Sequence, residues 1–211
     1  MPLTVSQADK WVRAFADVVA ERKTELTGLD SAIGDGDHGI NLDRGMRAVV
    51  EKLDAAEPGD LGGLLRAVGM TLISKVGGAS GPLYGTFFLE GGKSLGAMAE
   101  ASDADLVAAV TAAVAGVQAR GKAEPGDKTM VDALVPARDA LREAVEGGTG
   151  LDEALARAAE AAERGRDATK PLVARKGRAS YLGERSAGYV DPGATSSALL
   201  LRCAATTLAS G

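Results

Sequence analysis

Residues 4–19 read Thr-Val-Ser-Gln-Ala-Asp-Lys-Trp-Val-Arg-Ala-Phe-Ala-Asp-Val-Val, and their apolar side chains recur every three or four positions. This period places the apolar residues, Trp11 among them, on one face of an α-helix. Thr4 and Gln7 have the spacing of a capping box, in which each side chain accepts a hydrogen bond from the other residue's backbone N–H. The stretch therefore predicts a helix over about residues 5–26 with one face toward a core.

The same period continues along most of the chain and is interrupted mainly at glycine and proline. No alternating run of apolar and polar residues is long enough to demand a strand. The sequence therefore predicts an all-α fold with about eight helices, in a single domain over residues 1–211. The expected helices cover about residues 5–26, 39–53, 61–76, 82–99, 103–119, 129–145, 151–169 and 192–208.

The composition is that of an ordinary globular protein, with 211 residues of which 45% are hydrophobic and 25% are charged. The net charge of −5 provides no electrostatic drive toward nucleic acid or an anionic membrane, so nucleic-acid binding is not expected. The N-terminus does not resemble a signal peptide, and the longest Ala-rich apolar stretch, residues 106–117, is too short to span a bilayer. Cys203 is the only cysteine, so no internal disulfide can form. We expect a cytoplasmic protein with no membrane span.

Residues 28–41 read Gly-Leu-Asp-Ser-Ala-Ile-Gly-Asp-Gly-Asp-His-Gly-Ile-Asn and place Asp30, Asp35 and Asp37 within eight positions. Buried together without cations, three carboxylates would repel one another strongly. A divalent cation removes that repulsion, and an oxygen-only ligand set favours Mg²⁺ or Ca²⁺ over zinc. The spacing does not fit the ligand and glycine positions of an EF-hand loop. An alternative stays open here, in which one aspartate caps a helix and the others are solvated turn residues.

Gly34, Gly36 and Gly39 separate these acids and lead directly into a predicted helix. Glycines leave the backbone N–H groups accessible, and a helix N-terminus attracts anions, so the segment also suits a phosphate. His38 is the only histidine, and we expect it to hydrogen-bond to a phosphate oxygen rather than to act in catalysis. Carboxylates beside amides predict a site for a metal–phosphate complex.

Three further segments contain residues suited to binding. Residues 77–81 are glycine-rich and precede a helix, with Ser80 able to donate to a phosphate or to cap the helix. Residues 121–129 have a glycine spacing like that of a P-loop, but Asp127 stands where the P-loop lysine belongs and no strand precedes it. Residues 170–191 form a long basic segment, which is either a solvated loop or a functional one that offers an arginine to a phosphate.

Four motifs occur in one order along nearly the whole chain. Together they resemble the nucleotide-binding subunits of dihydroxyacetone kinase, the DhaL family. That resemblance implies a barrel of eight antiparallel helices, which agrees with the helix count from the periodicity. The motifs are Asp30–Asn41, Gly77–Gly85, Gly126–Leu134, and Gly177–Arg185 continuing through Asp191–Ser197.

The resemblance also implies a role for each residue of the site. Three aspartates would hold two Mg²⁺ ions that bridge the phosphates of a bound nucleotide. The remaining positions would contact the nucleotide, with Gly121 and Met130 at the adenine and Arg178 at the phosphates. The metal ligands would be Asp30, Asp35 and Asp37, and the nucleotide contacts His38, Gly39, Ile40, Asn41, Ala79, Ser80, Gly121, Met130, Arg178, Asp191, Pro192 and Gly193.

The implied activity is phosphoryl transfer by positioning and charge neutralisation, with no covalent nucleophile from this chain. In the family, a phosphohistidine on a donor protein of the phosphotransferase system recharges tightly held ADP to ATP. The phosphoryl group then passes to dihydroxyacetone on a separate kinase subunit in glycerol catabolism. Whether the chain forms a homodimer stays open at this point. Three alternatives remain: an ATP-dependent kinase subunit for a related ketose or triose, a nucleotide-state regulatory module, and a Ca²⁺-binding helical protein.

Overall fold

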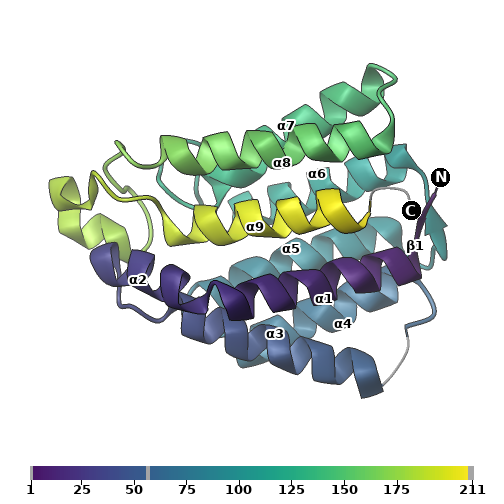
Figure 1. The fold of residues 1–211 in the computed structure, drawn as a ribbon, viewed down its shortest axis with the longest axis horizontal. Helices are drawn as coiled ribbons and strands as arrows, with labels where there is room; N and C mark the ends of the chain where they lie inside the picture. The colour runs from purple at the N-terminus through teal and green to yellow at the C-terminus, as the bar shows by residue number, and fades with distance from the viewer. Residues whose placement is uncertain (1, 56–57, 209–211) are drawn as a thin grey trace.

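The computed structural model describes residues 2–55 and 58–208, and helices dominate this part of the chain (Figure 1). It contains nine α-helices, one 3-10 helix and one antiparallel pair of two-residue strands, so the predicted all-α class is confirmed. The helices are α1 (Val5–Glu21), α2 (Lys23–Ile33), α3 (His38–Ala55), α4 (Leu61–Lys75), α5 (Ser80–Leu95), α6 (Asp103–Gly121), α7 (Val131–Glu146), α8 (Leu151–Ala168), the 3-10 helix η1 (Arg178–Ser186) and α9 (Pro192–Thr207), and the strands are β1 (Leu3–Thr4) and β2 (Glu100–Ala101).

The prediction of one helix over residues 5–26 is wrong, because α1 ends at Glu21 and α2 begins at Lys23. Arg22 leaves the helical conformation with φ −92° and ψ 8°, although its N–H still donates to the carbonyl of Val18. Neither glycine nor proline marks the break, so the sequence pattern contains no signal for it. The second helix then continues to Ile33 and places Asp30 in a helical turn, where a loop was expected.

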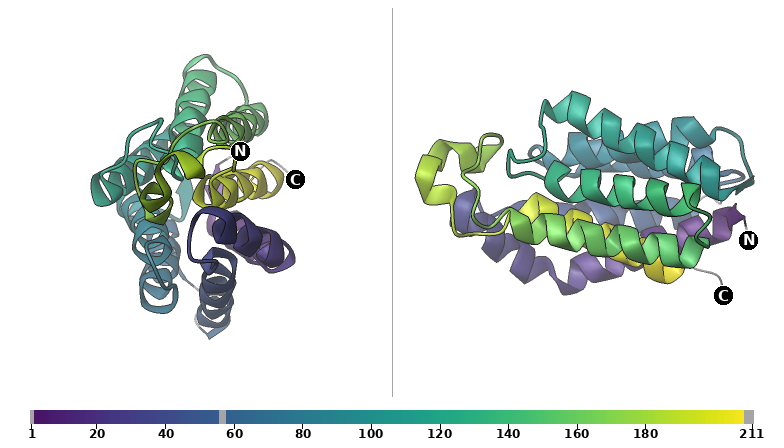
Figure 2. Two further views of the ribbon diagram at one scale, coloured as in Figure 1. Left: turned by 90° about the vertical axis from the view of Figure 1, so that its left-hand side faces the viewer. Right: turned by 90° about the horizontal axis from the view of Figure 1, so that it is seen from above.

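Neighbouring helices along the chain pack against one another. Helix α1 contacts α3 and α9, and from α3 to α9 each helix contacts the next, while α2 packs on α3 and α9 (Figure 2). Within the described residues, no helix is long and apolar enough to cross a membrane.

The interior between these helices is built from aliphatic and small residues with a few aromatic rings. Trp11 of α1 and Phe88 of α5 have ring centroids 5.7 Å apart, and the Trp11 indole N–H donates to the carbonyl of Leu200 at 2.9 Å. This contact joins α1, α5 and α9, and it satisfies the single polar atom of a buried indole. The apolar face of α1 therefore packs into a core, as its amphipathic pattern predicted.

Helices α4 and α5 approach each other closely at glycines. A Cβ added at Gly69 would lie 2.8 Å from the carbonyl oxygen of Gly85, and one added at Gly62 would lie 2.1 Å from that of Gly96. Real Cβ atoms do not come so near, so the distance between these helices requires glycine at both positions. The close packing holds α4 and α5 against each other along their length.

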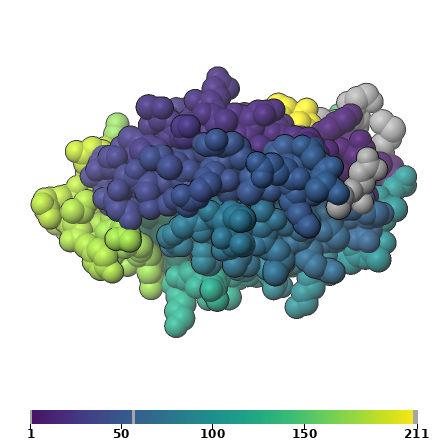
Figure 3. Space-filling view, turned by 90° about the horizontal axis from the view of Figure 1, so that it is seen from below, coloured from purple at the N-terminus to yellow at the C-terminus, as the bar shows by residue number. Residues whose placement is uncertain are grey.

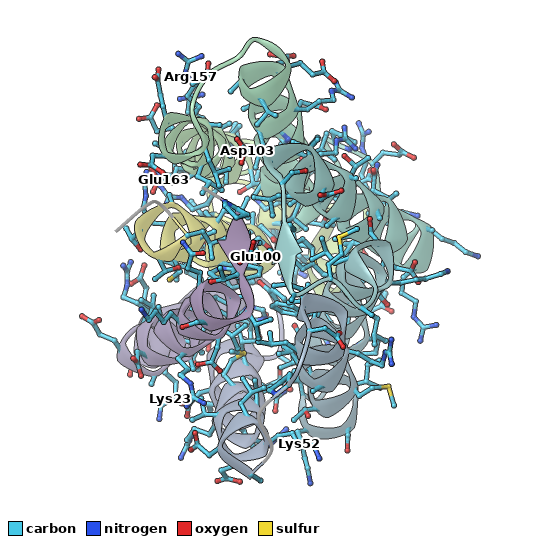
Figure 4. The ribbon with its side chains drawn as sticks, turned by 90° about the vertical axis from the view of Figure 1, so that its right-hand side faces the viewer. Lys23, Lys52, Glu100, Asp103, Arg157 and Glu163 are labelled. Carbon is cyan, nitrogen blue, oxygen red and sulfur yellow. The ribbon has the colours of Figure 1, made fainter. Side chains whose placement is uncertain are left out.

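The two ends of the molecule differ. The loops that precede α3, α5, α7 and α9 gather at the end that holds η1, drawn at the left of Figure 1. The opposite end holds β1 and β2, with Leu3 paired to Ala101 in antiparallel register, and Figure 4 views this end with Glu100 labelled. The predicted functional segments therefore lie together at one end.

Candidate functional site

A cleft of about 910 Å³ opens at the end of the molecule that holds η1. Its lining includes His38, Ser80, Val131 and Pro192, which begin helices α3, α5, α7 and α9. A helix N-terminus presents unpaired N–H groups and the positive end of the helix dipole. Four such termini around one cleft favour an anionic ligand such as a phosphate chain.

Three carboxylates lie together on one wall of this cleft. Asp30 belongs to α2 and is buried, while Asp35 and Asp37 belong to the loop between α2 and α3. One oxygen of each lies within 4.8 Å of the others, which is a spacing that a single divalent cation can bridge. The spacing from the sequence predicted this grouping, and the structure brings all three side chains together.

Hydrogen bonds and glycines shape the acidic loop. Oδ2 of Asp30 accepts from the backbone N–H groups of Asp37 and His38 at 2.8 and 3.1 Å. A Cβ at Gly34 would lie 2.1 Å from Oδ1 of Asp30, so a side chain there would force this carboxylate to move. Gly36 has φ +72°, a conformation that favours glycine. Gly34 and Gly36 therefore allow the loop to adopt the conformation that places the carboxylates close together.

Arg178 of η1 also lines the cleft and pairs with one of these carboxylates. Its Nε lies 2.7 Å from Oδ2 of Asp35, and about two thirds of its side chain is exposed. The arginine belongs to the long basic segment, which the structure therefore places over the cleft rather than out in solvent. Figure 3 shows this yellow-green segment packed against the purple and blue helices of the N-terminal part.

His38 lies in a hydrogen-bond network that joins three helix starts. Its Nδ1 lies 3.0 Å from Oγ of Ser80, and its Nε2 lies 2.9 Å from Oγ of Ser196. Ser196 donates to the carbonyl of Gly193 and lies 2.6 Å from the hydroxyl of Tyr84. A serine hydroxyl has one proton, so this network is satisfied when Nε2 of His38 donates to Ser196 and Nδ1 accepts from Ser80. Burial lowers the pKa of His38, which favours the neutral ring that this arrangement needs.

Asp191 caps α9 at the floor of the cleft. Its Oδ2 accepts from the backbone N–H of Ala194 at 2.7 Å, and its own N–H donates to Oγ1 of Thr169. Burial raises the pKa of Asp191 to about 7, because removal from water penalises the charged carboxylate more than the N–H bond from Ala194 stabilises it. Burial also raises the pKa of Tyr84 to about 12. Both groups are therefore neutral over part or all of the physiological pH range.

The lining of the cleft contains twelve of the fifteen predicted site residues. Gly39, Ile40 and Asn41 do not line it. Gly39 faces α2, where an added Cβ would lie 2.2 Å from the carbonyl oxygen of Lys23, and Ile40 points outward with half of its surface exposed. The predicted residues that line the cleft are Asp30, Asp35, Asp37, His38, Ala79, Ser80, Gly121, Met130, Arg178, Asp191, Pro192 and Gly193.

Sequence reasoning missed several residues of the lining, chiefly Arg120, Lys128 and Tyr181. Lys128 belongs to residues 121–129, which differ from a P-loop because Asp127 stands where the lysine belongs and no strand precedes the segment. A buried lysine in a short glycine-containing turn gives no periodic signal, since its burial depends on a segment some 40 residues away in sequence. Only the local motif Gly126–Leu134, taken as a unit, pointed to this segment.

Comparisons with known proteins bear on this site. A family model described as the DAK2 domain matches residues 32–206. The chain is 47% identical over 196 residues to the ADP-binding subunit DhaL of the PEP-dependent dihydroxyacetone kinase of Escherichia coli K12, covering 93% of each chain. It is 45% identical over 192 residues to the corresponding subunit of PEP-dependent dihydroxyacetone kinase 1 of Listeria innocua, covering 90% of each.

A solved structure has the same fold. The dihydroxyacetone kinase of C. freundii, in complex with AMP-PNP and Mg²⁺, superposes with a TM-score of 0.74 at 28% sequence identity. The match covers 98% of this chain and 34% of that one, so the chain spans about a third of the length of the solved protein.

Proposed function

The chain belongs to the DAK2 domain family, and from this membership we propose that it is the ADP-binding subunit of a PEP-dependent dihydroxyacetone kinase. The observation that carries the proposal is the convergence of three carboxylates and four helix N-termini on one cleft. The carboxylates suit divalent cations and the helix N-termini suit phosphates, so together they suit a metal–nucleotide complex. Near-complete coverage of subunits of this name, at 47% and 45% identity, supports the same assignment.

Asp30, Asp35 and Asp37 would hold Mg²⁺, and their all-oxygen donor set fits that ion. We propose two ions, because the resemblance to the DhaL family implies two. Bound there, Mg²⁺ would neutralise charge on the phosphate oxygens during transfer. Asp30 would also have a structural role in this site, because its Oδ2 accepts hydrogen bonds from the backbone N–H groups of Asp37 and His38.

We propose that the other lining residues bind the nucleotide. Nδ1 of His38 lies 3.0 Å from Oγ of Ser80 at the starts of α3 and α5, and a bound phosphate would accept the hydroxyl proton of Ser80 in place of this nitrogen. His38 would then border the phosphate through its ring. Gly121 and Met130 border the adenine, Arg178 reaches the phosphates, and Ala79 with residues 191–193 completes the pocket. Gly39 and Ile40 remain in the proposal as part of the first turn of α3, whose early backbone N–H groups have no partner within the helix. Asn41 remains because the resemblance implies it, although its own backbone N–H donates to the carbonyl of Asp37 at 2.8 Å.

The proposed reaction needs no nucleophilic side chain from this chain. A phosphohistidine donor protein would transfer its phosphoryl group to resident ADP, and the new γ-phosphoryl group would pass to a hydroxyl of dihydroxyacetone held by a separate kinase subunit. This chain's residues contribute by holding the nucleotide and by placing positive charge around the moving group. An open cleft at one end of the molecule suits a site that two partners must reach in turn.

The remaining parts of the proposal concern the arrangement and setting of the chain. We propose that the helices close into a barrel of eight, supported by the unbroken series of contacts from α1 through α3 to α9 and back to α1. A single domain, a possible homodimer and a cytoplasmic location complete the proposal. The buried, unpaired Cys203 is compatible with that location.

The test is to purify the chain gently with Mg²⁺, denature it, and identify the released nucleotide by chromatography and mass spectrometry. About one ADP per chain that survives extensive dialysis is the expected result. Dihydroxyacetone phosphate should then form only when the kinase subunit and the phosphorylated donor protein are both added. Turnover with free ATP and no donor protein would instead identify an ATP-exchanging kinase, and a chain that binds neither nucleotide would overturn the kinase assignment.

A further inference from the structure

Lys128 is a buried lysine whose ammonium group lies among carbonyl oxygens. Only 1% of its surface is exposed, and its Nζ lies within 3.5 Å of five backbone carbonyl oxygens. The two shortest contacts are 2.6 Å to Tyr189 and 2.8 Å to Ser186. All five carbonyls belong to residues 169–191, the segment that joins α8 to α9, which we call the strap. The carbonyls are those of Thr169, Lys170, Leu172, Ser186 and Tyr189.

These contacts join the two legs of the strap. Thr169, Lys170 and Leu172 lie on the leg that leaves α8, and the other two residues lie on the leg that returns to α9. An ammonium group has three protons, so it can bond to both legs at once. Burying a charge without such partners costs several kcal/mol, so the cation strongly favours the closed position of both legs.

The residues around Lys128 are themselves fixed. The carboxylate of Asp132 in α7 accepts from the backbone N–H groups of Gly126 and Thr129. The carbonyl of Asp127 accepts from the backbone N–H of Arg175 in the strap at 3.1 Å. Lys128 itself has φ +64°, a strained conformation for a residue with a side chain. The lysine therefore extends into the strap from a rigid connector between α6 and α7.

The strap presents Arg178 to the acidic wall of the cleft. Besides the bond from the backbone N–H of Arg175 to Asp127 and the pair of Arg178 with Asp35, the strap is held near the acidic loop by a small apolar cluster. This cluster consists of Ile33 from α2 with Ala174, Ala179 and Leu182 from the strap. Such a cluster buries little area, so it fixes the strap less firmly than a charged group bonded to both legs. The position of Arg178 opposite Asp35 thus depends on Lys128.

We propose that Lys128 is a positioning residue that acts through the strap to hold Arg178 at the phosphate end of the nucleotide site. This inference rests on the proposed function for the identity of the ligand, whereas the tether itself rests on the contacts above. Lys128 lies at the wall of the cleft, but its ammonium group donates to the carbonyl oxygens of the strap and not to Asp30, Asp35 or Asp37. Its effect on nucleotide binding should therefore disappear when Arg178 is absent.

The first experiment is a double-mutant cycle with Mg·ADP as the titrant in calorimetry. Lys128→Met and Arg178→Ala should each weaken binding about tenfold or more, and the double variant should bind no worse than Arg178→Ala alone. Lys122→Met is the matched control, because Lys122 lies in the same connector, also has positive φ and is exposed. The control should bind like the wild type, and additive losses in the double variant would overturn the proposal.

The second experiment needs no nucleotide. Limited trypsin digestion, followed by mass spectrometry, measures cleavage after Arg175, Lys176 and Arg178 at a temperature well below the unfolding transition. Lys128→Met should raise these rates about tenfold or more over the wild type and Lys122→Met, while cleavage at other sites stays unchanged. Equal strap cleavage in all three would overturn the tether.

Two outcomes separate this inference from the proposed function. A wild-type chain that fails to bind Mg·ADP would overturn the proposed function, and the digestion would still decide whether Lys128 holds the strap. Where Lys128→Met does not fold, Lys128→Gln keeps an N–H donor of similar length without the charge. It should give partial release of the strap, and no release in a folded Lys128→Gln chain would overturn the role of the charge.

Discussion

Nε of Arg178 lies 2.7 Å from Oδ2 of Asp35, so a cation of the protein already pairs with one of the three clustered carboxylates. A metal ion bound at the proposed site would therefore compete with this arginine for Asp35. The pair is partly exposed, and pairs of that kind contribute about 0.2–1 kcal/mol. The same arginine should oppose binding of the bare metal and favour binding of the metal with its nucleotide.

Arg178→Ala should accordingly change two affinities in opposite directions. Binding of Mn²⁺ alone, followed by electron paramagnetic resonance as a probe for Mg²⁺, should tighten by a few-fold at most. Binding of Mg·ADP should weaken, because the arginine no longer meets the phosphates. Arg157→Ala on the exposed face of α8, where Arg157 pairs with Glu153, is a suitable control. Weaker binding of both ligands would contradict the shared-ligand interpretation.

Asp30 should have two separable functions. Asp30→Asn removes the charge but keeps a carbonyl oxygen that can accept from the backbone N–H groups of Asp37 and His38. It should abolish tight retention of Mg·ADP while the midpoint of thermal unfolding changes little. Asp30→Ala should lose retention and also lower the free energy of unfolding by about 1–3 kcal/mol, because two N–H groups lose their acceptor.

The control for both Asp30 variants is Asp54→Asn, which alters an exposed carboxylate paired with Arg13. Retention of the nucleotide, measured by chromatography after denaturation, should match that of the wild type. Full retention in Asp30→Asn would show that its charge is not needed for the metal–nucleotide complex.

Gly69→Ala should destabilise the fold, because its Cβ would lie 2.8 Å from the carbonyl oxygen of Gly85 and from the side chain of Leu89. Overpacking of this kind costs about 1–3 kcal/mol, measured by urea denaturation. Gly28→Ala is the matched control, since Gly28 lies within α2 with no atom near the added Cβ. It should stabilise by about 0.5–1 kcal/mol through the helix preference of alanine. Equal effects at both positions would contradict the close approach of α4 and α5.

The elevated pKa of Asp191 should make the unfolding free energy depend on pH. The native state holds the proton up to about pH 7, whereas the unfolded carboxyl loses it near 3.8. The native state therefore binds more protons in this window, so stability falls as pH rises from about 4 to 7. Asp191→Asn should remove this component of the slope, measured by urea denaturation of nucleotide-free protein.

His38 should make the free energy of unfolding depend on pH in the opposite sense. Its pKa is lowered by burial, so the unfolded state binds more protons just below pH 6.5 and stability falls as pH drops through that range. His38→Gln should remove this second component. An unchanged pH profile in both variants would contradict the buried environment of the two groups.

Much of the fold could be predicted from the sequence because amphipathic helices repeat a simple period. The capping box at Thr4 and Gln7 is present as expected, since such a cap depends on residues only three positions apart. The break at Arg22 could not be predicted. It reflects how α1 and α2 pack against α3 and α9, which is information that no local window contains.

The candidate site likewise has a part that the local sequence predicted and a part that it could not predict. The cluster of Asp30, Asp35 and Asp37 lies within eight residues of sequence, so its spacing alone predicted the grouping. The part of the site at Arg178 was recognised through resemblance, whereas the position of the strap depends on contacts between Lys128 and residues 41 to 61 positions away. Such long-range contacts leave no mark in periodicity or local spacing.

The opposite ends of the molecule have an experimental use. The strand Leu3–Thr4 and the last turn of α9 both lie at the end that faces away from the cleft (Figures 1 and 4). An affinity tag, a fluorophore or a surface linker attached there projects away from the cleft and from the strap. Immobilised through either terminus, the protein presents its cleft to solution, where sequential docking of two protein partners can be recorded in real time.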